Sequence, residues 1–394
     1  MMAKTVILGF ARTPFGRFLG SLRNVPAVEL GAAVIREALN RSMADGGRVD
    51  NVIMGMVVQA GAGQIPSRQS AVRAGLPPEV PSETINKVCA SGLRAVNLGD
   101  LMIKSGDGTL IVAGGMENMS AVPHYLPRIR EGARMGDTAV VDGMIHDGLW
   151  CPFHNVHMGV HGSAVPAENG ITRSDMDRFA LRSHRLAAAS IDNGKMAEEI
   201  VPVCIPAKKG DPVLLEQDEL PRRDTSLEKL AVLPPAFEKE GLITAGNAPP
   251  ISDGAGALVL ASEDLARAEG WNPLAEIVSR GMASLPPRYI ATVPLAAAEK
   301  ALAAAGLSAS RMDLIEVNEA FAAVALTCIK LGGWDEEKVN VNGGAVALGH
   351  PIGASGARIL MTLIAELRRR GGGYGLATIC SGAAQGEATV IKVA

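Results

Sequence analysis

A cysteine lies where a strand-like segment of this chain gives way to a helix-like one. Residues 83–88 favour a strand, residues 93–103 favour a helix, and Cys89 stands between them. A thiol at a helix N-terminus faces free backbone N–H groups and the positive end of the helix dipole, which lower its pKa. Because the thiolate is the nucleophilic form of cysteine, this junction predicts a nucleophile. A buried structural thiol is the commoner role of an isolated cysteine, so the decision depends on the rest of the chain.

Three other segments place polar side chains beside small residues. His350 lies in a glycine-rich turn, residues 342–356, in which Pro351 restricts the backbone. This turn lacks the Gly-Lys-Ser/Thr ending of a phosphate-binding loop, and its glycines leave the histidine approachable. Cys380 ends a buried strand-like segment, and Asn318 follows another, where a simple helix N-cap is the alternative role. These surroundings favour a functional histidine at position 350.

A fourth segment has the residue types of a metal site. Cys151, His154, His157 and His161 fall within eleven residues. Their spacing is loose for zinc, and the segment lacks the paired Cys-x-x-Cys that structural zinc sites use. We therefore expect a wall of a pocket here, and no metal.

Composition excludes several classes of protein. The chain has 394 residues, enough for two or three domains, and a net charge of -3 without a basic stretch for nucleic acid. It contains no apolar run of the roughly 18 residues that span a membrane. Its five irregularly spaced cysteines predict reduced thiols. Because a strand begins almost at once, we expect no signal peptide and a cytoplasmic location. The 45 glycines and 3 % aromatic residues suit closely stacked layers.

Strand and helix patterns alternate through residues 5–117, are lost in the loop-rich stretch 118–248, and return after it. Alternation of this kind predicts a mostly parallel sheet with helical crossovers. The two ends follow one plan, since Ser91-Gly92-Leu93-Arg94 is echoed by Ser355-Gly356-Ala357-Arg358. Two similar halves that face each other would bring their helix N-termini together.

Taken together, these segments resemble the motifs of the thiolase family, and most closely those of its acetyl-CoA acetyltransferases. The resemblance extends from about residue 4 to the C-terminus. It rests on five motifs in order: Asn86–Gly92, Gly114–Ser120, Asn318–Phe321, Gly343–Gly356 and Cys380–Gly386.

The resemblance implies an α/β fold of five layers, αβαβα. Residues 1–117 and 249–270 would form the N-terminal half, residues 271–394 the C-terminal half, and residues 118–248 an inserted loop domain for CoA binding and oligomer contacts. It also implies a homotetramer or homodimer.

The resemblance further implies an acyltransferase of fatty acid metabolism. The reaction would be the reversible condensation of acetyl-CoA with an acyl-CoA, or thiolysis of a 3-ketoacyl-CoA, most simply acetoacetyl-CoA. CoA thioesters would be substrates, with no tightly bound cofactor and no metal. No nucleic acid partner is expected.

By the same resemblance, Cys89 takes the acyl group, His350 activates it, and Cys380 moves a proton on the methyl carbon. Asn318 would hold a water that forms one oxyanion hole with His350. The backbone N–H groups of Cys89 and Gly382 would form the other. The positions that match CoA contacts are Arg222, His157, Met158, Phe237, Ala248 and Pro249.

Two segments depart from the family pattern. His161-Gly162-Ser163-Ala164 stands where Thr-Ala-Glu-Asn is usual, and Pro249 replaces a serine that contacts pantetheine. Proline has neither a hydroxyl nor an N–H with which to replace that contact. The departures bear on substrate length, branching and CoA affinity, so longer or branched substrates are an alternative. A non-catalytic acyl-CoA-binding relative and a subunit that depends on a partner also stay open. A decarboxylating ketoacyl synthase is disfavoured by the second cysteine at 380.

Overall fold

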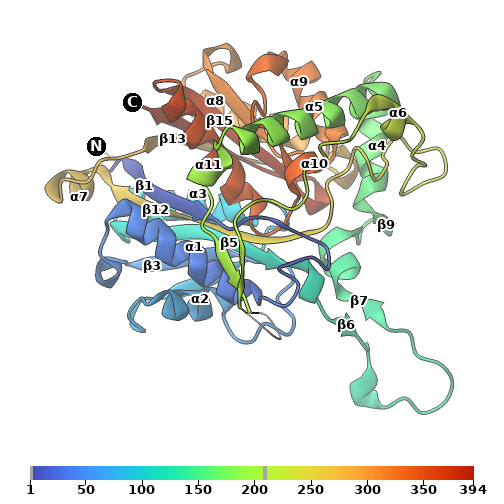
Figure 1. Ribbon diagram of the computed structural model, residues 1–394, viewed down its shortest axis with the longest axis horizontal. Coiled ribbons are helices and arrows are strands. Elements are labelled where there is room, and N and C mark those ends of the chain that lie inside the picture. Colours follow the sequence, from blue (N-terminus) through green and yellow to red (C-terminus); the bar gives the residue numbers. More distant parts are fainter. Residues whose placement is uncertain (1–2, 207–210) are drawn as a thin grey trace.

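The computed structural model describes residues 3–206 and 211–394, and a continuous mixed sheet forms its centre (Figure 1). From one edge to the other the strands are β4 (Ser82–Ile85), β3 (Asn51–Gly55), β5 (Leu110–Asn118), β12 (Ser252–Ser262), β1 (Thr5–Arg12), β13 (Ala275–Ser284), β16 (Gln385–Val393), β15 (Gly373–Ser381) and β14 (Leu314–Val317). The short strand β2 (Gly16–Arg17) pairs with β12. The antiparallel pair β1 and β13 joins the two halves of the chain.

The two halves of the sheet share one pairing scheme. In the N-terminal half, β1, β12 and β5 are antiparallel and β3 and β4 continue in parallel. In the C-terminal half, β13, β16 and β15 are antiparallel and β14 is parallel to β15. The expectation of a mostly parallel sheet was therefore wrong. Strands joined by helical crossovers are parallel, whereas β12 returns from the long insertion and β16 follows a tight turn, so both reverse direction.

Helices complete the layers. The longer ones of the two halves are α1 (Ala27–Ser42), α2 (Pro66–Ala74), α3 (Ser91–Ser105), α8 (Val293–Ala305), α9 (Ala322–Gly332) and α11 (Ser355–Arg369), with the short helices α7 (Glu263–Ala268) and α10 (Ala345–Leu348). Helices α1 and α2 cover the outer face of the N-terminal half, and α8 covers that of the C-terminal half. Helices α3 and α11 lie between the halves and contact strands of both. The five-layered αβαβα prediction is confirmed.

The two central helices meet at glycines near their N-termini. A Cβ atom on Gly92 would lie 2.8 Å from the backbone nitrogen of Ala357, and one on Gly356 would collide with Leu93. Only glycine allows the backbones to approach this closely. The helix N-termini, and with them Cys89 and the His350 turn, are therefore brought together as the repeated pattern predicted.

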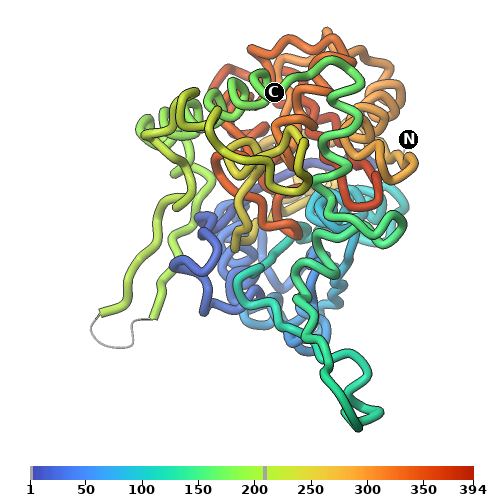
Figure 2. The backbone as a smooth tube through the Cα atoms, turned by 90° about the vertical axis from the view of Figure 1, so that its right-hand side faces the viewer, coloured from blue at the N-terminus to red at the C-terminus, as the bar shows by residue number. Residues whose placement is uncertain are grey.

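The segment between β5 and β12 is built of short elements. It contains the helices α4 (Met158–Glu168), α5 (Arg173–Asp192) and α6 (Leu227–Ala231), and the strand pairs β6–β7 (His124–Tyr125, Val141–Asp142), β8–β9 (Trp150–Cys151, Val156–His157) and β10–β11 (Val203–Ile205, Val213–Leu215). Figure 2 shows two arms that project from the body, one carrying β6–β7 and one carrying β10–β11. Helix α5 begins with a capping box of Thr172 and Asp175.

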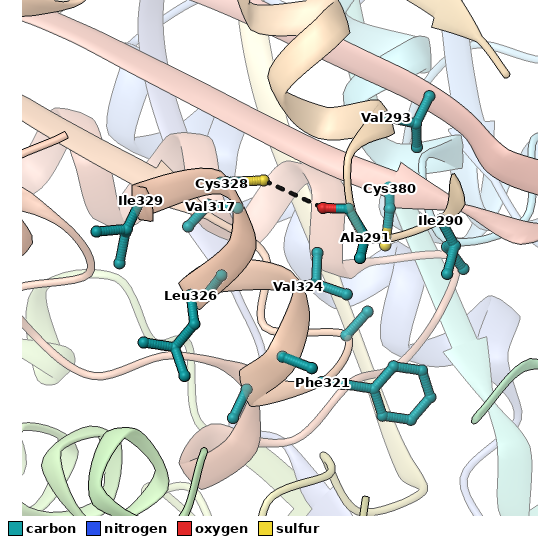
Figure 3. Packing of buried hydrophobic residues seen from close by; sticks show 14 of the residues in the cluster. Ile290, Ala291, Val293, Val317, Phe321, Val324, Leu326, Cys328, Ile329 and Cys380 are labelled. Atoms are coloured by element: carbon teal, nitrogen blue, oxygen red, sulfur yellow. Dashed lines mark hydrogen bonds between the residues drawn. The ribbon is translucent and has the colours of Figure 1, made fainter. Parts of the chain in front are cut away.

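An apolar core fills the C-terminal half around α9. Figure 3 shows Val324, Phe321 and Ile290 in this core, where the thiol of Cys328 donates to the carbonyl oxygen of Ala291 at 3.6 Å. Cys380 belongs to the same cluster and has no exposed surface. The end of β15 therefore places the Cys380 thiol in an environment of low polarity. Within the described ranges, no helix is both long and apolar enough to cross a membrane.

Candidate active site

Cys89 follows a tight turn that is braced by its own side chains. Val88 has a left-handed backbone (φ 44°), which is strained for a β-branched residue. The Ser91 hydroxyl accepts from the Lys87 N–H at 2.8 Å and donates to the Val88 carbonyl at 2.7 Å, and Asn86 accepts from the Val88 N–H at 2.9 Å. These bonds hold the strained turn and fix the half-buried thiol at the start of α3.

The Cys89 thiol is not acidic, contrary to the expectation from its place at a helix N-terminus. Burial raises its pKa to about 12, and the negative charge of Glu117 raises it further. The backbone N–H groups of Cys89 and Gly382 act in the opposite direction, which shows that both point toward the sulfur. Burial raises the pKa by more than the two N–H groups lower it, because removing a thiolate from solvent costs more free energy than two hydrogen bonds recover. To act as the predicted nucleophile, Cys89 would need a base.

His350 is held in place through one of its two ring nitrogens. Its Nδ1 lies 2.6 Å from Ser355 Oγ, and Ser355 donates its hydroxyl to the Pro351 carbonyl at 3.0 Å. Because that hydroxyl hydrogen is already used, Ser355 accepts from His350, which assigns the proton to Nδ1. Nε2 is buried and has no partner among the described residues. Burial, followed by the charge of Arg358, lowers the His350 pKa to about 3, so the imidazole is neutral with a free lone pair on Nε2.

Cys380 lies at the end of β15, close enough to Cys89 for their charges to interact. Its pKa is raised well above the ordinary value, first by burial and then by the neighbouring Cys89 and Cys328. The next residue, Ser381, donates a hydrogen bond to the carbonyl oxygen of Lys87. This bond ties the Cys380 strand end to the Cys89 turn, so the two thiols share one rigid frame.

Asn318 is buried with an unsatisfied side chain. Neither Oδ1 nor Nδ2 has a hydrogen-bond partner within residues 3–206 and 211–394. Helix α9 starts at Ala322 with Phe321 as its N-cap, so the simpler N-cap role for Asn318 is wrong. A buried amide without partners costs free energy, which is typical of a group kept for function.

A cavity of about 500 Å³ opens at Cys89. Its wall includes all the predicted CoA contacts and three predicted catalytic residues: Cys89, His350, Gly382, Arg222, His157, Met158, Phe237, Ala248 and Pro249. Cys380 and Asn318 are not in the wall. The rings of His157 and Phe237 stack with centroids 4.2 Å apart. Sequence reasoning missed the apolar residues of this wall, which include Met119, Ile145, Leu149, Ile251, Ile290 and Ile352.

Sequence reasoning also missed the part that Glu117 plays. This buried carboxylate accepts backbone N–H bonds from Val57 at 2.9 Å, Val58 at 3.2 Å and Gly353 at 3.1 Å. It thereby links the end of β3 to the His350 turn. Burial raises its pKa to about 7. An acidic residue at the end of the apolar run Leu110–Met116 was the available signal.

Glu319 anchors the same turn from the other side. Its carboxylate accepts from Ser183 Oγ at 2.7 Å, from Asn340 Nδ2 at 2.9 Å and from the Val346 N–H at 2.9 Å. Ser183 lies on α5 and Val346 on α10, so this one buried carboxylate connects the insertion to the glycine-rich turn.

The segment 151–161 divides between two surroundings. His157 and Met158 line the cavity, as the expected pocket wall would. Cys151, His154 and His161 do not, and they cluster together instead, with His154 Nδ1 3.0 Å from His161 Nε2. The departure at His161 therefore lies outside the cavity wall, whereas the departure at Pro249 lies in it.

Known proteins match the chain over its whole length. The thiolase N-terminal domain family matches residues 5–264, and the thiolase C-terminal domain family matches residues 271–393. Acetyl-CoA acetyltransferases of Pseudomonas aeruginosa and Cupriavidus necator are 49 % and 50 % identical, with 99 % of this chain aligned to 99 % and 100 % of theirs. The crystal structure of the Bacillus anthracis acetyl-CoA acetyltransferase superposes with a TM-score of 0.97 at 40 % identity, covering 100 % of this chain and 99 % of that one. With its two halves, paired cysteines and glycine-rich histidine turn, the chain belongs to the thiolase family.

Proposed function

We propose that this protein is an acetyl-CoA C-acetyltransferase, which cleaves acetoacetyl-CoA with CoA and runs the reverse condensation. One observation carries the proposal. A thiol of high pKa and a neutral imidazole with a free Nε2 line one cavity, and a second thiol lies close to the first. The acetyl-CoA acetyltransferases aligned over the full chain support the same reaction.

In thiolysis, His350 Nε2 takes the proton of Cys89, and the sulfur attacks the ketone carbon of acetoacetyl-CoA. The carbon–carbon bond breaks, the acetyl group stays on Cys89, and Cys380 gives its proton to the departing carbanion, which leaves as acetyl-CoA. A CoA thiol then gives its proton to the Cys380 thiolate and attacks acetyl-Cys89. The bond between the acetyl carbon and the Cys89 sulfur breaks, the Cys89 thiolate takes back the proton held by His350, and the second acetyl-CoA leaves. Splitting the reaction at a thioester makes two feasible steps.

Each step places negative charge on an oxygen beside Cys89. The backbone N–H groups of Cys89 and Gly382 already point toward the sulfur, which supports their assignment as one oxyanion hole. The unsatisfied amide of Asn318, which would hold a water, and Nε2 of His350, once it carries the proton taken from Cys89, support the other. The high pKa of Cys380 suits a base for a weak carbon acid, because its thiolate is strongly basic once formed.

The rest of the cavity suits a CoA thioester. Arg222 offers a guanidinium for the phosphates, and the stacked His157 and Phe237 form a flat apolar wall for the pantetheine arm. No tightly bound cofactor is needed. Because Pro249 lines this wall without a hydroxyl or N–H, a preference for longer or branched 3-ketoacyl-CoAs is the second candidate.

We also propose residues 118–248 as a loop domain for CoA binding and subunit contacts, flanked by halves at 1–117 with 249–270 and at 271–394. The end of β5 at Asn118 and the start of β12 at Ser252 support these bounds. The family resemblance supports a homotetramer or homodimer of fatty acid metabolism that works in the cytoplasm.

The test is thiolysis of acetoacetyl-CoA by CoA, followed by loss of the ultraviolet absorbance of the ketoacyl enolate. We expect rapid turnover that Cys89→Ala and Cys380→Ala both abolish. Cys204→Ala is the matched control, since Cys204 is an exposed thiol and does not line the cavity. A chain-length series of 3-ketoacyl-CoAs separates the two candidates. Inactivity of the folded protein on every member of that series would contradict the proposed function.

A further inference from the structure

Cys151, His154 and His161 come together beside the active site. Cys151 ends β8, His154 lies in the turn before β9, and His161 lies in the first turn of α4. The Cys151 sulfur and one ring nitrogen of each histidine all lie within 4.8 Å of one another. The two imidazole rings meet edge to face at an interplanar angle of 80°. These distances enclose a space of the size that a small cation needs.

The three donor atoms lie near the spacing of a tetrahedral cation site. With metal–sulfur bonds of about 2.3 Å and metal–nitrogen bonds of about 2.0 Å, ligand atoms of a tetrahedral zinc site lie roughly 3.3–3.7 Å apart. The 3.0 Å between His154 Nδ1 and His161 Nε2 needs only a small opening to reach that spacing.

We propose that Cys151, His154 and His161 bind a divalent transition metal ion of the zinc class, with water as the fourth ligand. One thiolate and two imidazoles select such an ion over magnesium or calcium, which prefer oxygen ligands. On binding, the Cys151 thiol loses its proton to solvent and the sulfur donates an electron pair to the metal, without any redox change. The site does not depend on the proposed acyltransferase reaction, and none of its three ligands lines the cavity.

The electrostatics of the cluster permit binding. Arg288 is the neighbouring cation, close enough to His161 for its charge to act on that ring. Arg288 opposes a cation, but it is paired with Glu168 on the same side. His154 is exposed and gives the ion a route from solvent, while Cys151 is buried and protects the thiolate.

A metal at this position would connect the β8–β9 turn to α4. His157 and Met158, which line the cavity, lie between the ligands His154 and His161 in the chain. Strand β8 also packs against the turn Gly382–Ala384 that supplies the proposed oxyanion donor. The bound ion would therefore stiffen one wall of the substrate cavity, much as a disulfide would, without entering the chemistry.

The test uses full-length, tag-free protein stripped with a chelator, in a Cys89→Ala background that removes the half-buried active-site thiol. Cobalt(II) is titrated in and its absorbance recorded. We expect one equivalent to give the intense visible bands of tetrahedral cobalt and a thiolate-to-cobalt band in the near ultraviolet, both reversed by one equivalent of zinc. Cys204→Ser and His124→Gln, which remove an exposed thiol and an exposed imidazole elsewhere, should leave the spectra unchanged.

Three variants decide the assignment. Cys151→Ser should abolish the near-ultraviolet band. Cys151→Asp should keep the visible bands but lose the near-ultraviolet band, because a carboxylate can still bind the metal but is not a thiolate. His154→Asn changes an exposed residue, so it should fold normally and weaken cobalt binding at least tenfold. A titration without a thiolate band, or one that His154→Asn leaves unchanged, would overturn the site and show that the cluster is only a hydrogen-bonded histidine pair beside a free thiol.

Discussion

Ser355 Oγ lies 2.6 Å from Nδ1 of His350 and at the same time donates its hydroxyl hydrogen to the carbonyl of Pro351. This arrangement keeps the histidine proton on Nδ1 and leaves Nε2 free as a base. The pair lies at the start of α11, where the glycine-rich turn meets the central helix layer. The tautomer that the proposed reaction needs is thus built into the backbone of the turn.

Ser355→Ala should remove this control of the tautomer. We expect kcat/KM for thiolysis to fall at least tenfold, or about 1.4 kcal/mol in the barrier, because part of the histidine population then carries its proton on Nε2. Nitrogen NMR of labelled histidine reports the tautomer directly. Ser67→Ala is the matched control, since Ser67 is also buried and also donates to a carbonyl, that of Val52. Equal activity losses in both variants would assign Ser355 a structural role only.

The buried, neutral His350 should make stability depend on pH. Its folded pKa of about 3 is below the ordinary 6.5, so the unfolded chain binds more protons between these values and stability falls as the pH falls. Between pH 6.5 and 5.5 this one group removes about 1 kcal/mol of the free energy of unfolding. Urea unfolding of wild type and His350→Asn at both pH values measures the difference. If the two proteins lose stability in parallel, His350 is not buried as a neutral group.

Cys89 should react slowly with alkylating reagents at neutral pH. Because its pKa is raised to about 12, the thiolate fraction grows about tenfold for each pH unit, and alkylation by iodoacetamide should accelerate steadily from pH 7 to pH 10. Peptide mass spectrometry separates Cys89 from the exposed Cys204. A rate that levels off by pH 8 would contradict the raised pKa and would indicate the acidic cysteine that the helix N-terminus alone predicts.

Glu117→Gln should disturb both the turn and the nucleophile. The carboxylate accepts three backbone N–H bonds, and a glutamine can place its oxygen toward only some of them, so its amide N–H₂ faces another donor. We expect a loss of about 1–3 kcal/mol in the free energy of unfolding. Removal of the charge should also speed Cys89 alkylation, which a purely structural change would not do. If stability fell while the rate of Cys89 alkylation stayed the same, the Glu117 charge would have no effect on the nucleophile.

The sequence predicted what local patterns determine. Helix α3 contains the segment 93–103 whose pattern predicted a helix, and strand β5 ends at Asn118, where the loop-rich stretch was predicted to begin, because apolar spacing is a local signal. The layered fold followed from a resemblance spread over five motifs. The direction of the strands could not be predicted in this way, because antiparallel pairing depends on where β12 and β16 return to the sheet.

The site shows the same division. Motifs singled out Cys89, His350 and Cys380, but the direction of the Cys89 pKa could not be predicted, since burial depends on the whole fold. Glu117 lies in the motif Gly114–Ser120, but the motif does not predict its three backbone partners, which are distant in the chain. The cluster of Cys151, His154 and His161 was dismissed because its spacing fits no standard zinc pattern, yet a strand end and a helix start bring the donors together.

The proposed mechanism predicts that an acetyl group rests on one residue, Cys89, while Cys380 moves a proton. Intact-protein and peptide mass spectrometry after brief exposure to acetyl-CoA measures this directly. We expect one added acetyl group on Cys89 in the wild type, the same acetyl-Cys89 in Cys380→Ser without turnover to acetoacetyl-CoA, and none in Cys89→Ala. Acetylation at another residue, or unimpaired condensation by Cys380→Ser, would contradict the account.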